Sequence, residues 1–306
     1  MSIFLYIFIV IAFVISNLFQ LFTTISIEAQ IITATFFILL VGVPHGSLDH
    51  ILIPRHSLNS KIKFYIFYLG LIVLNLLIWH YNQVLGLTIF LLISSYHFGE
   101  TQLFHLNLKK RLLTHFTYLI WGSSVLFTFI FYNIAEFVDL SHVYADTQNL
   151  LTHFDLDSLV YLFYFTNGLI GVLFLSFVLF FGVKPRLVIS EVFFLIVMHL
   201  SSFLFPLIIC FTLFFIVLHS LPSLSNQYNH FKSTNDKFSL KKFILLMAPY
   251  SSVSVFFIVF ICFCSHMNYI NYSIPLISIV LISVITLPHS FIILKFNNSL
   301  TSSKSQ

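Results

Sequence analysis

The sequence predicts an all-α integral membrane protein, a polytopic helix bundle of about ten transmembrane helices. Hydrophobic residues make up 59% of the 306 residues, whereas Asp, Glu, Lys and Arg together make up only 8%. A soluble domain carries about 25% charged residues. Apolar runs near 20 residues, the length that crosses a bilayer as a helix, recur along the whole chain. This composition excludes a soluble enzyme, a nucleic-acid-binding protein and a disordered regulator.

The apolar runs divide the chain into ten predicted spans, which together form a single integral membrane domain over residues 1–306. One long apolar stretch has to be divided at Phe205-Pro206, because Pro206 lacks a backbone N–H and disfavours helix at the residue before it. The polar connections 133–158 and 223–242 are expected to be loops. The predicted spans are residues 3–25, 30–48, 64–80, 83–106, 112–132, 159–182, 187–204, 205–221, 243–264 and 273–294.

The basic residues support this division independently. With ten spans, all 14 Lys and Arg residues fall on one side of the membrane, and the opposite side receives only acidic charges. The positive-inside rule makes the basic side cytoplasmic. Both termini are therefore expected in the cytoplasm.

Four histidines lie at similar depths in four of the predicted spans. Each lies 14 to 16 residues after the predicted outer start of its span, which corresponds to about 21–24 Å at the α-helical rise. They are His45 in Gly-Val-Pro-His-Gly-Ser-Leu-Asp, His97 in Tyr-His-Phe-Gly-Glu, His219 in Leu-His-Ser and His289 in Leu-Pro-His-Ser.

One intramembrane histidine bonded to a backbone carbonyl is an ordinary core residue, but four at one depth indicate a shared site. Polar side chains inside a bilayer are costly and face the bundle interior, where they mark functional sites. Neutral imidazoles suit a borderline metal such as iron, copper or zinc. We therefore predict that these four histidines are metal ligands, and we predict no catalytic side chain beyond them.

Two carboxylates accompany the first two histidines. Asp49 follows His45 by four residues and Glu100 follows His97 by three, so each shares a helix face with its histidine. Either carboxylate is suited to orient the second nitrogen of a histidine as an outer-shell partner. Capping near the membrane interface is an equally good interpretation, and both stay open.

These segments resemble the Brp/Blh family of membrane β-carotene 15,15′-dioxygenases. The resemblance rests on Gly-Val-Pro-His45-Gly-Ser-Leu-Asp, Tyr-His97-Phe-Gly-Glu, His219-Ser220 and Thr286-Leu-Pro-His289, in that order along most of the chain. It implies ferrous iron (Fe2+) bound by histidines and cleavage of the central double bond of β-carotene with O2 to give two retinals. His45, His97 and His219 match the iron ligands that it implies. It further implies a location in the bacterial cytoplasmic (inner) membrane.

The chain departs from the family in one motif. The family's third motif is His-Ser-x-Arg-His, whereas this chain has Ser223 in place of the second histidine and lacks the Arg. Either His289 completes the site, or the site has fewer protein ligands, or the activity is altered. The depth of His289 favours the first of these.

Two other functions are alternatives for this sequence. A membrane desaturase or hydroxylase also uses histidine-bound iron, and His45-x4-His50 faintly resembles one of its motifs, but its adjacent His-His pairs are absent. A non-enzymatic metal or proton transporter would need carboxylates at mid-membrane depth, which are nearly absent. The expected partners are a lipid-soluble carotenoid, O2 and membrane lipids, with no nucleic acid. The exact carotenoid, the oligomeric state and a rhodopsin partner are not specified by the sequence.

Overall fold

The structure is a computed structural model that describes residues 2–21, 26–53, 57–106, 108, 110–143, 146–147 and 155–304. Within these residues every regular element is helical and no strand occurs. Nine helices among them are long and apolar enough to cross a membrane. The prediction of an all-α polytopic membrane protein is therefore confirmed.

The nine long helices coincide in order with the second to tenth predicted spans. The first predicted span, 3–25, contains α1 (Ile3–Leu21), whose apolar part Ile3–Asn17 is shorter than the nine; residues 22–25 lie outside the described residues. A tenth crossing by α1 and the cytoplasmic placement of the termini stay predictions. The nine are Ile27–Leu52, Leu58–Tyr81, Gln83–Leu106, Arg111–Tyr132, Leu156–Phe180, Pro185–Leu204, Leu207–Thr234, Leu240–His266 and Ile274–Ser299.

The predicted break at Phe205-Pro206 is confirmed. Helix α11 (Pro185–Leu204) ends there and α12 (Leu207–Leu213) begins, with Phe205 extended at φ −120° and ψ 148°. The N–H of Leu207 donates to the carboxylate of Glu136 at 2.6 Å. An N–H that has no intrahelical acceptor is thus satisfied by a side chain, as a helix start requires.

The chain forms two compact units, each described here by itself. Unit 1 comprises residues 1–42, 95–141 and 154–224, and unit 2 comprises residues 43–94, 142–153 and 225–306. Helices α6 (Gln83–Leu103), α8 (Ile134–Val143) and α13 (Leu221–Thr234) each contribute residues to both. The other elements of unit 1 are α1, α2 (Ile27–Phe37), the π-helix η1 (Ile38–Gly42), the 3-10 helix η2 (Phe104–Leu106), α7 (Arg111–Tyr132), α10 (Leu156–Phe180), α11, α12 and the π-helix η3 (Phe214–Ser220).

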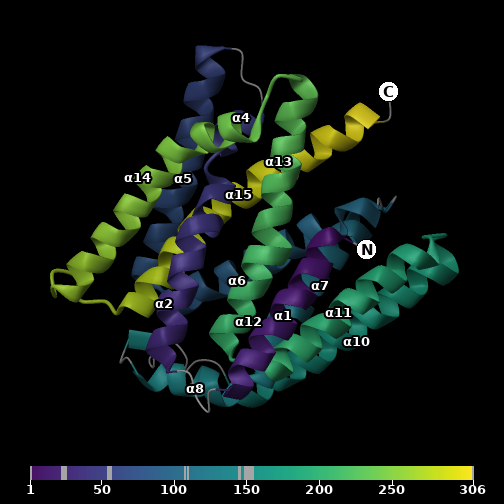
Figure 1. Ribbon diagram of the computed structural model, residues 1–306, viewed down its shortest axis with the longest axis horizontal. Helices are drawn as coiled ribbons and strands as arrows, with labels where there is room; N and C mark the ends of the chain where they lie inside the picture. The colour runs from purple at the N-terminus through teal and green to yellow at the C-terminus, as the bar shows by residue number, and fades with distance from the viewer. Residues whose placement is uncertain are drawn as a thin grey trace. The chain divides into compact units, whose positions relative to one another are not determined.

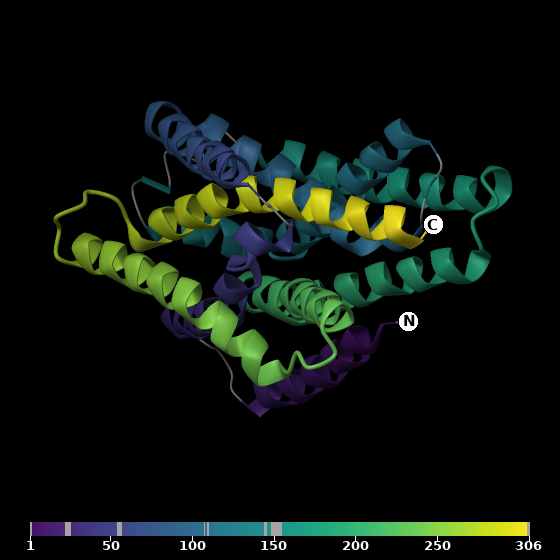
Figure 2. The same cartoon turned by 90° about the horizontal axis from the view of Figure 1, so that it is seen from above.

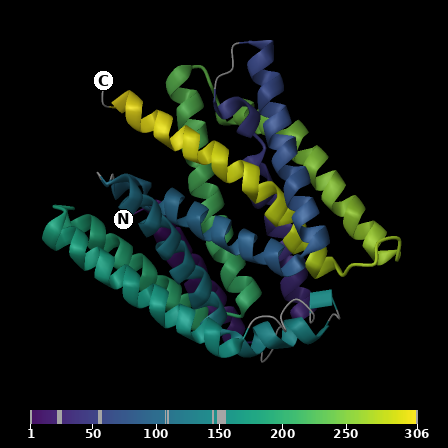
Figure 3. The ribbon, with the colours of Figure 1, turned by 180° about the vertical axis from the view of Figure 1, so that it is seen from behind.

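Helices α7, α10 and α11 pack against one another in unit 1, and α10 and α11 lie side by side in Figures 1 and 3. Phe131 of α7 stacks on Phe163 of α10 with ring centroids 3.8 Å apart. Ser124 of α7 also donates a hydrogen bond to Asn167 of α10 at 2.7 Å. Interhelical hydrogen bonds of this kind hold membrane helices together where lipid removes the hydrophobic driving force.

Two glycines let α6 and α7 approach closely in unit 1. A Cβ at Gly99 would overlap the backbone carbonyl of Tyr118, and one at Gly122 would overlap that of Ser95. Small residues at such crossings allow membrane helices to pack backbone against backbone. The crossing fixes the part of α6 that carries His97.

Unit 2 contains α3 (Val43–Gly46), α4 (Asp49–Leu52), α5 (Leu58–Tyr81), α14 (Leu240–His266) and α15 (Ile274–Lys304). Helix α15 packs along α5, as Figure 3 shows, and Figure 2 shows the reversal of the chain between α14 and α15. Buried polar groups join the first pair, because Asn75 of α5 donates to the carbonyl and hydroxyl of Ser283 at 3.0 and 3.1 Å.

The structure corrects both loop predictions. Helix α8 lies within 133–158, although residues 144–145 and 148–154 of that connection are outside the described residues. Helix α13 continues to Thr234 within 223–242. Hydropathy detects only segments as apolar as the bilayer, so it misses a polar helix that continues beyond such a segment.

Replacing Gly122 by Ala should destabilise the protein, since the added methyl group would overlap the backbone of α6. The expected loss is about 1–3 kcal/mol, the range for overpacking, measured as a lower apparent Tm in detergent. Gly171→Ala in α10 is the matched control, because nothing lies within 4 Å of a Cβ there. Equal Tm values for the two variants would contradict the close crossing.

Candidate metal centre

His45 lies directly after a widened stretch of helix. The π-helix η1 ends at Gly42, and Pro44 follows within α3. Proline has no N–H to donate to the carbonyl four residues before it, and its ring clashes with that carbonyl in a regular α-helix. Short π-helical stretches occur frequently at functional sites. The side chain that follows this distortion, His45, is buried, with 8% of its surface exposed.

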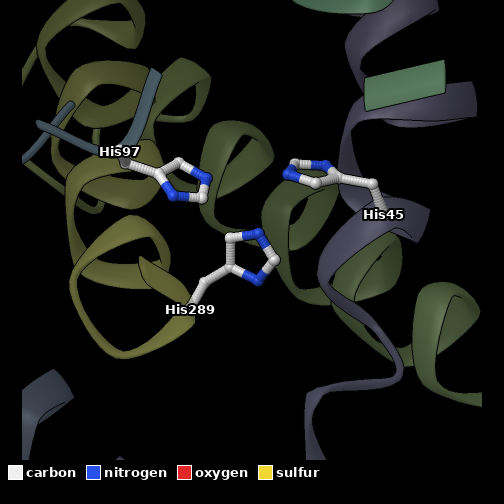
Figure 4. A group of neighbouring side chains, drawn as sticks. All are labelled: His45, His97 and His289. Carbon is white, nitrogen blue, oxygen red and sulfur yellow. The ribbon is translucent and has the colours of Figure 1, made fainter. Parts of the chain in front are cut away.

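Unit 2 brings His45 and His289 together. Their ring centroids lie 4.7 Å apart with the rings nearly perpendicular, and Figure 4 shows both side chains. Nδ1 of His289 lies 2.9 and 3.0 Å from the two carboxylate oxygens of Asp49. An ionised carboxylate only accepts hydrogen bonds, so this contact favours a proton on Nδ1 of His289, and a neutral ring with that proton has its lone pair on Nε2.

The carboxylate of Asp49 is itself held in place. The hydroxyl of Tyr68 in α5 donates to Asp49 Oδ2 at 3.1 Å, and only 3% of Asp49 is exposed. The sequence pattern paired Asp49 with His45, four residues earlier, whereas the structure places it against His289 from α15. A histidine whose second nitrogen donates to a carboxylate is the usual arrangement of a metal-ligating imidazole.

Unit 1 brings His97 and His219 together in the same manner. Their ring centroids lie 4.9 Å apart at an interplanar angle of 79°. Nδ1 of His219 lies 3.4 Å from the hydroxyl of Thr101, which is also 3.0 Å from the carbonyl of His97. A hydroxyl that donates to the carbonyl accepts from Nδ1 of His219, and a neutral ring in this tautomer has its lone pair on Nε2.

Aromatic rings enclose His219. Phe215 stacks on it with ring centroids 5.5 Å apart, and Phe98 meets it edge to face at 4.8 Å. His219 and Phe215 both belong to the π-helix η3. A Cβ at Gly42 would lie 2.7 Å from the Phe215 ring, so only glycine lets this ring pack against η1. The two π-helices of unit 1 therefore meet where His219 is positioned.

The polar helix α13 also supports the candidate site. Gln227 is fully buried and donates from Nε2 to the backbone carbonyl of His45 at 2.8 Å. It follows His219 by eight residues, which places it on the same helix face. Gln227 was not predicted from the sequence, because this stretch was expected to be a loop. Thr101 was not predicted either, although it follows His97 by four residues, nor was Tyr68, which no sequence pattern connects with Asp49.

The remaining predicted residues have distinct surroundings. Glu100 is completely buried, one turn after His97, and its orienting role stays a prediction. Ser223 is half-buried in α13, one turn after His219. His50 packs against the ring of Tyr250 at 4.1 Å. His199 is half-buried, with its Nε2 3.1 Å from the side-chain oxygen of Asn167.

Comparison with known proteins gave one match. A family model described as beta-carotene 15,15'-dioxygenase matches residues 36–297. The matched range includes both histidine pairs together with Asp49, Thr101 and Gln227. No curated protein and no solved structure was found to match the chain.

Replacing Asp49 by Ala should destabilise the fold, since the Nδ1 proton of His289 and the hydroxyl of Tyr68 would lose a buried acceptor. A buried donor without its acceptor costs about 1–3 kcal/mol, measurable as a lower apparent Tm in detergent. The control is Asp157→Ala, an exposed carboxylate in the first turn of α10, where a loss below about 1 kcal/mol is expected. Equal effects would show that the Asp49 contacts add nothing to stability.

Proposed function

The chain belongs to the beta-carotene 15,15′-dioxygenase family, and from that premise we propose that it binds ferrous iron and cleaves the central double bond of β-carotene with O2 into two molecules of retinal. Family membership makes it a carotenoid-cleaving enzyme, and its nine long apolar helices make it an integral membrane protein. We place it in the cytoplasmic membrane of a bacterium, with the basic residues inside. The proposed iron ligands are His45, His97, His219 and His289.

The observation that carries this proposal is the presence of two buried histidine pairs on the matched segments. In each pair one ring directs Nδ1 to an oxygen, which leaves Nε2 as the metal-binding atom. Three of the proposed ligands, His45, His97 and His289, are each buried within their units. Neutral nitrogen donors suit iron, copper or zinc, and the oxygenase activity of the family favours iron.

The protein residues have three tasks in this proposal. The four imidazoles hold the ion, Asp49 and Thr101 fix the orientation of two of the rings, and the rings of Phe98 and Phe215 exclude water beside His219. When bound, ferrous iron supplies the redox chemistry through which O2 reacts with an alkene. We assign no general acid or base, because alkene cleavage by O2 needs no proton donor.

We further propose that His289 takes the place of the histidine that Ser223 replaces. His289 is 3% exposed and lies against His45, another of the proposed ligands. Its hydrogen bond to Asp49 gives it the outer partner that metal-ligating histidines have. The family match also favours cleavage over the desaturase and transporter alternatives.

Expression in bacteria that accumulate β-carotene tests the proposed reaction. The orange colour should fade, and retinal should appear in extracts, in proportion to the amount of protein. Purified protein with ferrous iron and β-carotene should yield retinal as the principal product. Unchanged β-carotene in the presence of folded, iron-loaded protein would refute the proposal, and metal flux without retinal would indicate a transporter.

Replacing His289 by Ala should lower iron occupancy and retinal formation together, because one of four ligands is lost. Occupancy is measured on purified protein by metal analysis. The matched control is His199→Ala, since His199 bonds to Asn167 and is not a proposed ligand; it should keep its iron. Unchanged iron in the His289 variant would exclude this residue as a ligand.

Weakening the hydrogen bond between Asp49 and His289 should affect metal binding less than removing the imidazole of His289 does. Asp49→Asn keeps the size of the side chain but removes its charge, and loss of such partners lowers metal affinity about 10–100-fold. The readout is competition with a chelator of known affinity. An affinity equal to that of the unmodified protein would show that Asp49 contributes to the fold but not to the metal site.

A further inference from the structure

A mainly apolar cavity of about 260 Å³ lies within unit 2, between the ends of α5 and α14 and the beginning of α15. Leu76 and Tyr272 at its wall are each 44% exposed, so the cavity opens at the surface of the unit. The residues that line it include Leu76, Trp79, Tyr272, Ile277, Val280 and Leu281.

One wall of the cavity is held rigidly. The indole N–H of Trp79 donates to the hydroxyl of Ser283 at 3.0 Å, and Asn75 donates to the same residue. The other side of the indole lies against Gly86, where a Cβ would be only 2.6 Å from the ring. A buried indole fixed by a hydrogen bond and by close packing forms a wall that exists before any ligand binds, which lowers the cost of binding.

The cavity lies at a defined distance from a proposed iron ligand on the same helix. Leu281 and Ile277 precede His289 in α15 by eight and twelve residues. This corresponds to about 12 and 18 Å along the helix at the α-helical rise. The distance is comparable to that between the central double bond of extended β-carotene and either of its terminal rings.

We propose that this cavity binds one terminal hydrocarbon ring of the carotenoid substrate and thereby places the central double bond at the level of His289. The inference rests on the proposed function and names a binding site for one end of its substrate. A cavity of about 150 Å³ accommodates benzene, so this one has room for a trimethyl-substituted cyclohexene ring but not for the whole substrate. An opening at the surface of a membrane helix unit suits a ligand that arrives from the bilayer.

Filling the cavity tests the proposal. Val280→Phe should lower kcat/KM for β-carotene about tenfold or more, mainly through KM, since overpacking removes the space for the ring. The matched control is Val253→Phe, the same change at an exposed position of α14 outside the cavity, which should leave kcat/KM unchanged. Both variants should carry as much iron as the unmodified protein.

A truncated substrate separates loss of the ring site from general damage. A carotenoid dialdehyde shortened at both ends has no ring, and neither of its ends reaches the cavity. Its cleavage should change less than about threefold in Val280→Phe, since the shortened ends need no room there. Equal losses for both substrates, or no loss for β-carotene, would overturn the proposal.

Direct binding provides a measurement that is independent of turnover and of the Val280 variant. β-Ionone, which consists of the terminal ring with a short side chain, should quench the fluorescence of Trp79 in the intact protein. The protein has two tryptophans, so Trp79→Phe leaves Trp121 as the only emitter and should abolish the quenching. Quenching that persists in Trp79→Phe, or that is absent from the intact protein, would contradict binding at this cavity.

The outcomes distinguish this inference from the proposed function. If the unmodified protein forms no retinal, the proposed function fails whatever β-ionone does. If it forms retinal while Val280→Phe matches Val253→Phe on β-carotene, the proposed function stands and the ring site is wrong. A shift of the Trp79 emission by a saturated acyl chain of similar volume, with no effect of β-ionone, would instead identify a lipid site and overturn the proposal.

Discussion

The need to satisfy polar groups inside the protein governs the candidate site. Only 8% of the residues are charged and 59% are hydrophobic. A buried imidazole has no water to hydrogen bond with, so its N–H needs an acceptor within the fold. Asp49 accepts from His289 and the hydroxyl of Thr101 accepts from His219. Each of these bonds also determines which ring nitrogen keeps its lone pair. The hydrogen bond that satisfies the buried Nδ1 therefore also leaves Nε2 as the proposed metal-binding atom.

Local departures from regular helix geometry then place the histidines. In unit 1 the π-helices η1 and η3 meet through Gly42 and the ring of Phe215, which stacks on His219. The Gly99 and Gly122 positions bring α6 and α7 into backbone contact beside His97. A regular helix with larger side chains would keep these backbones apart. Helix distortion and close packing thus perform the positioning that loops perform in many soluble enzymes.

The sequence predicted the helices well because membrane helices follow from a single property, the length of an apolar run. It also selected four histidines that the structure shows to be buried, since polar residues are rare in such spans. It did not predict the partners of the site. The bond from Gln227 to His45 requires α13 to continue through a polar stretch, and the bond from Tyr68 to Asp49 joins residues 19 positions apart. Neither hydropathy nor short spacing contains that information, because tertiary packing brings these residues together.

The replacement of a motif histidine by Ser223 changes how two of the proposed ligands are held relative to one another. Two histidines four residues apart on one helix are spaced by the helix itself. His45 and His289 are separated by most of the chain, so their spacing has to come from tertiary contacts. Asp49 provides such a contact, because it follows His45 by four residues and hydrogen bonds directly to His289. The backbone bonds from Ser47 to Pro44 and from Leu52 to Leu48 shape the short connection between His45 and Asp49. A carboxylate anchored next to one histidine thus fixes the other, as the helical turn would have done.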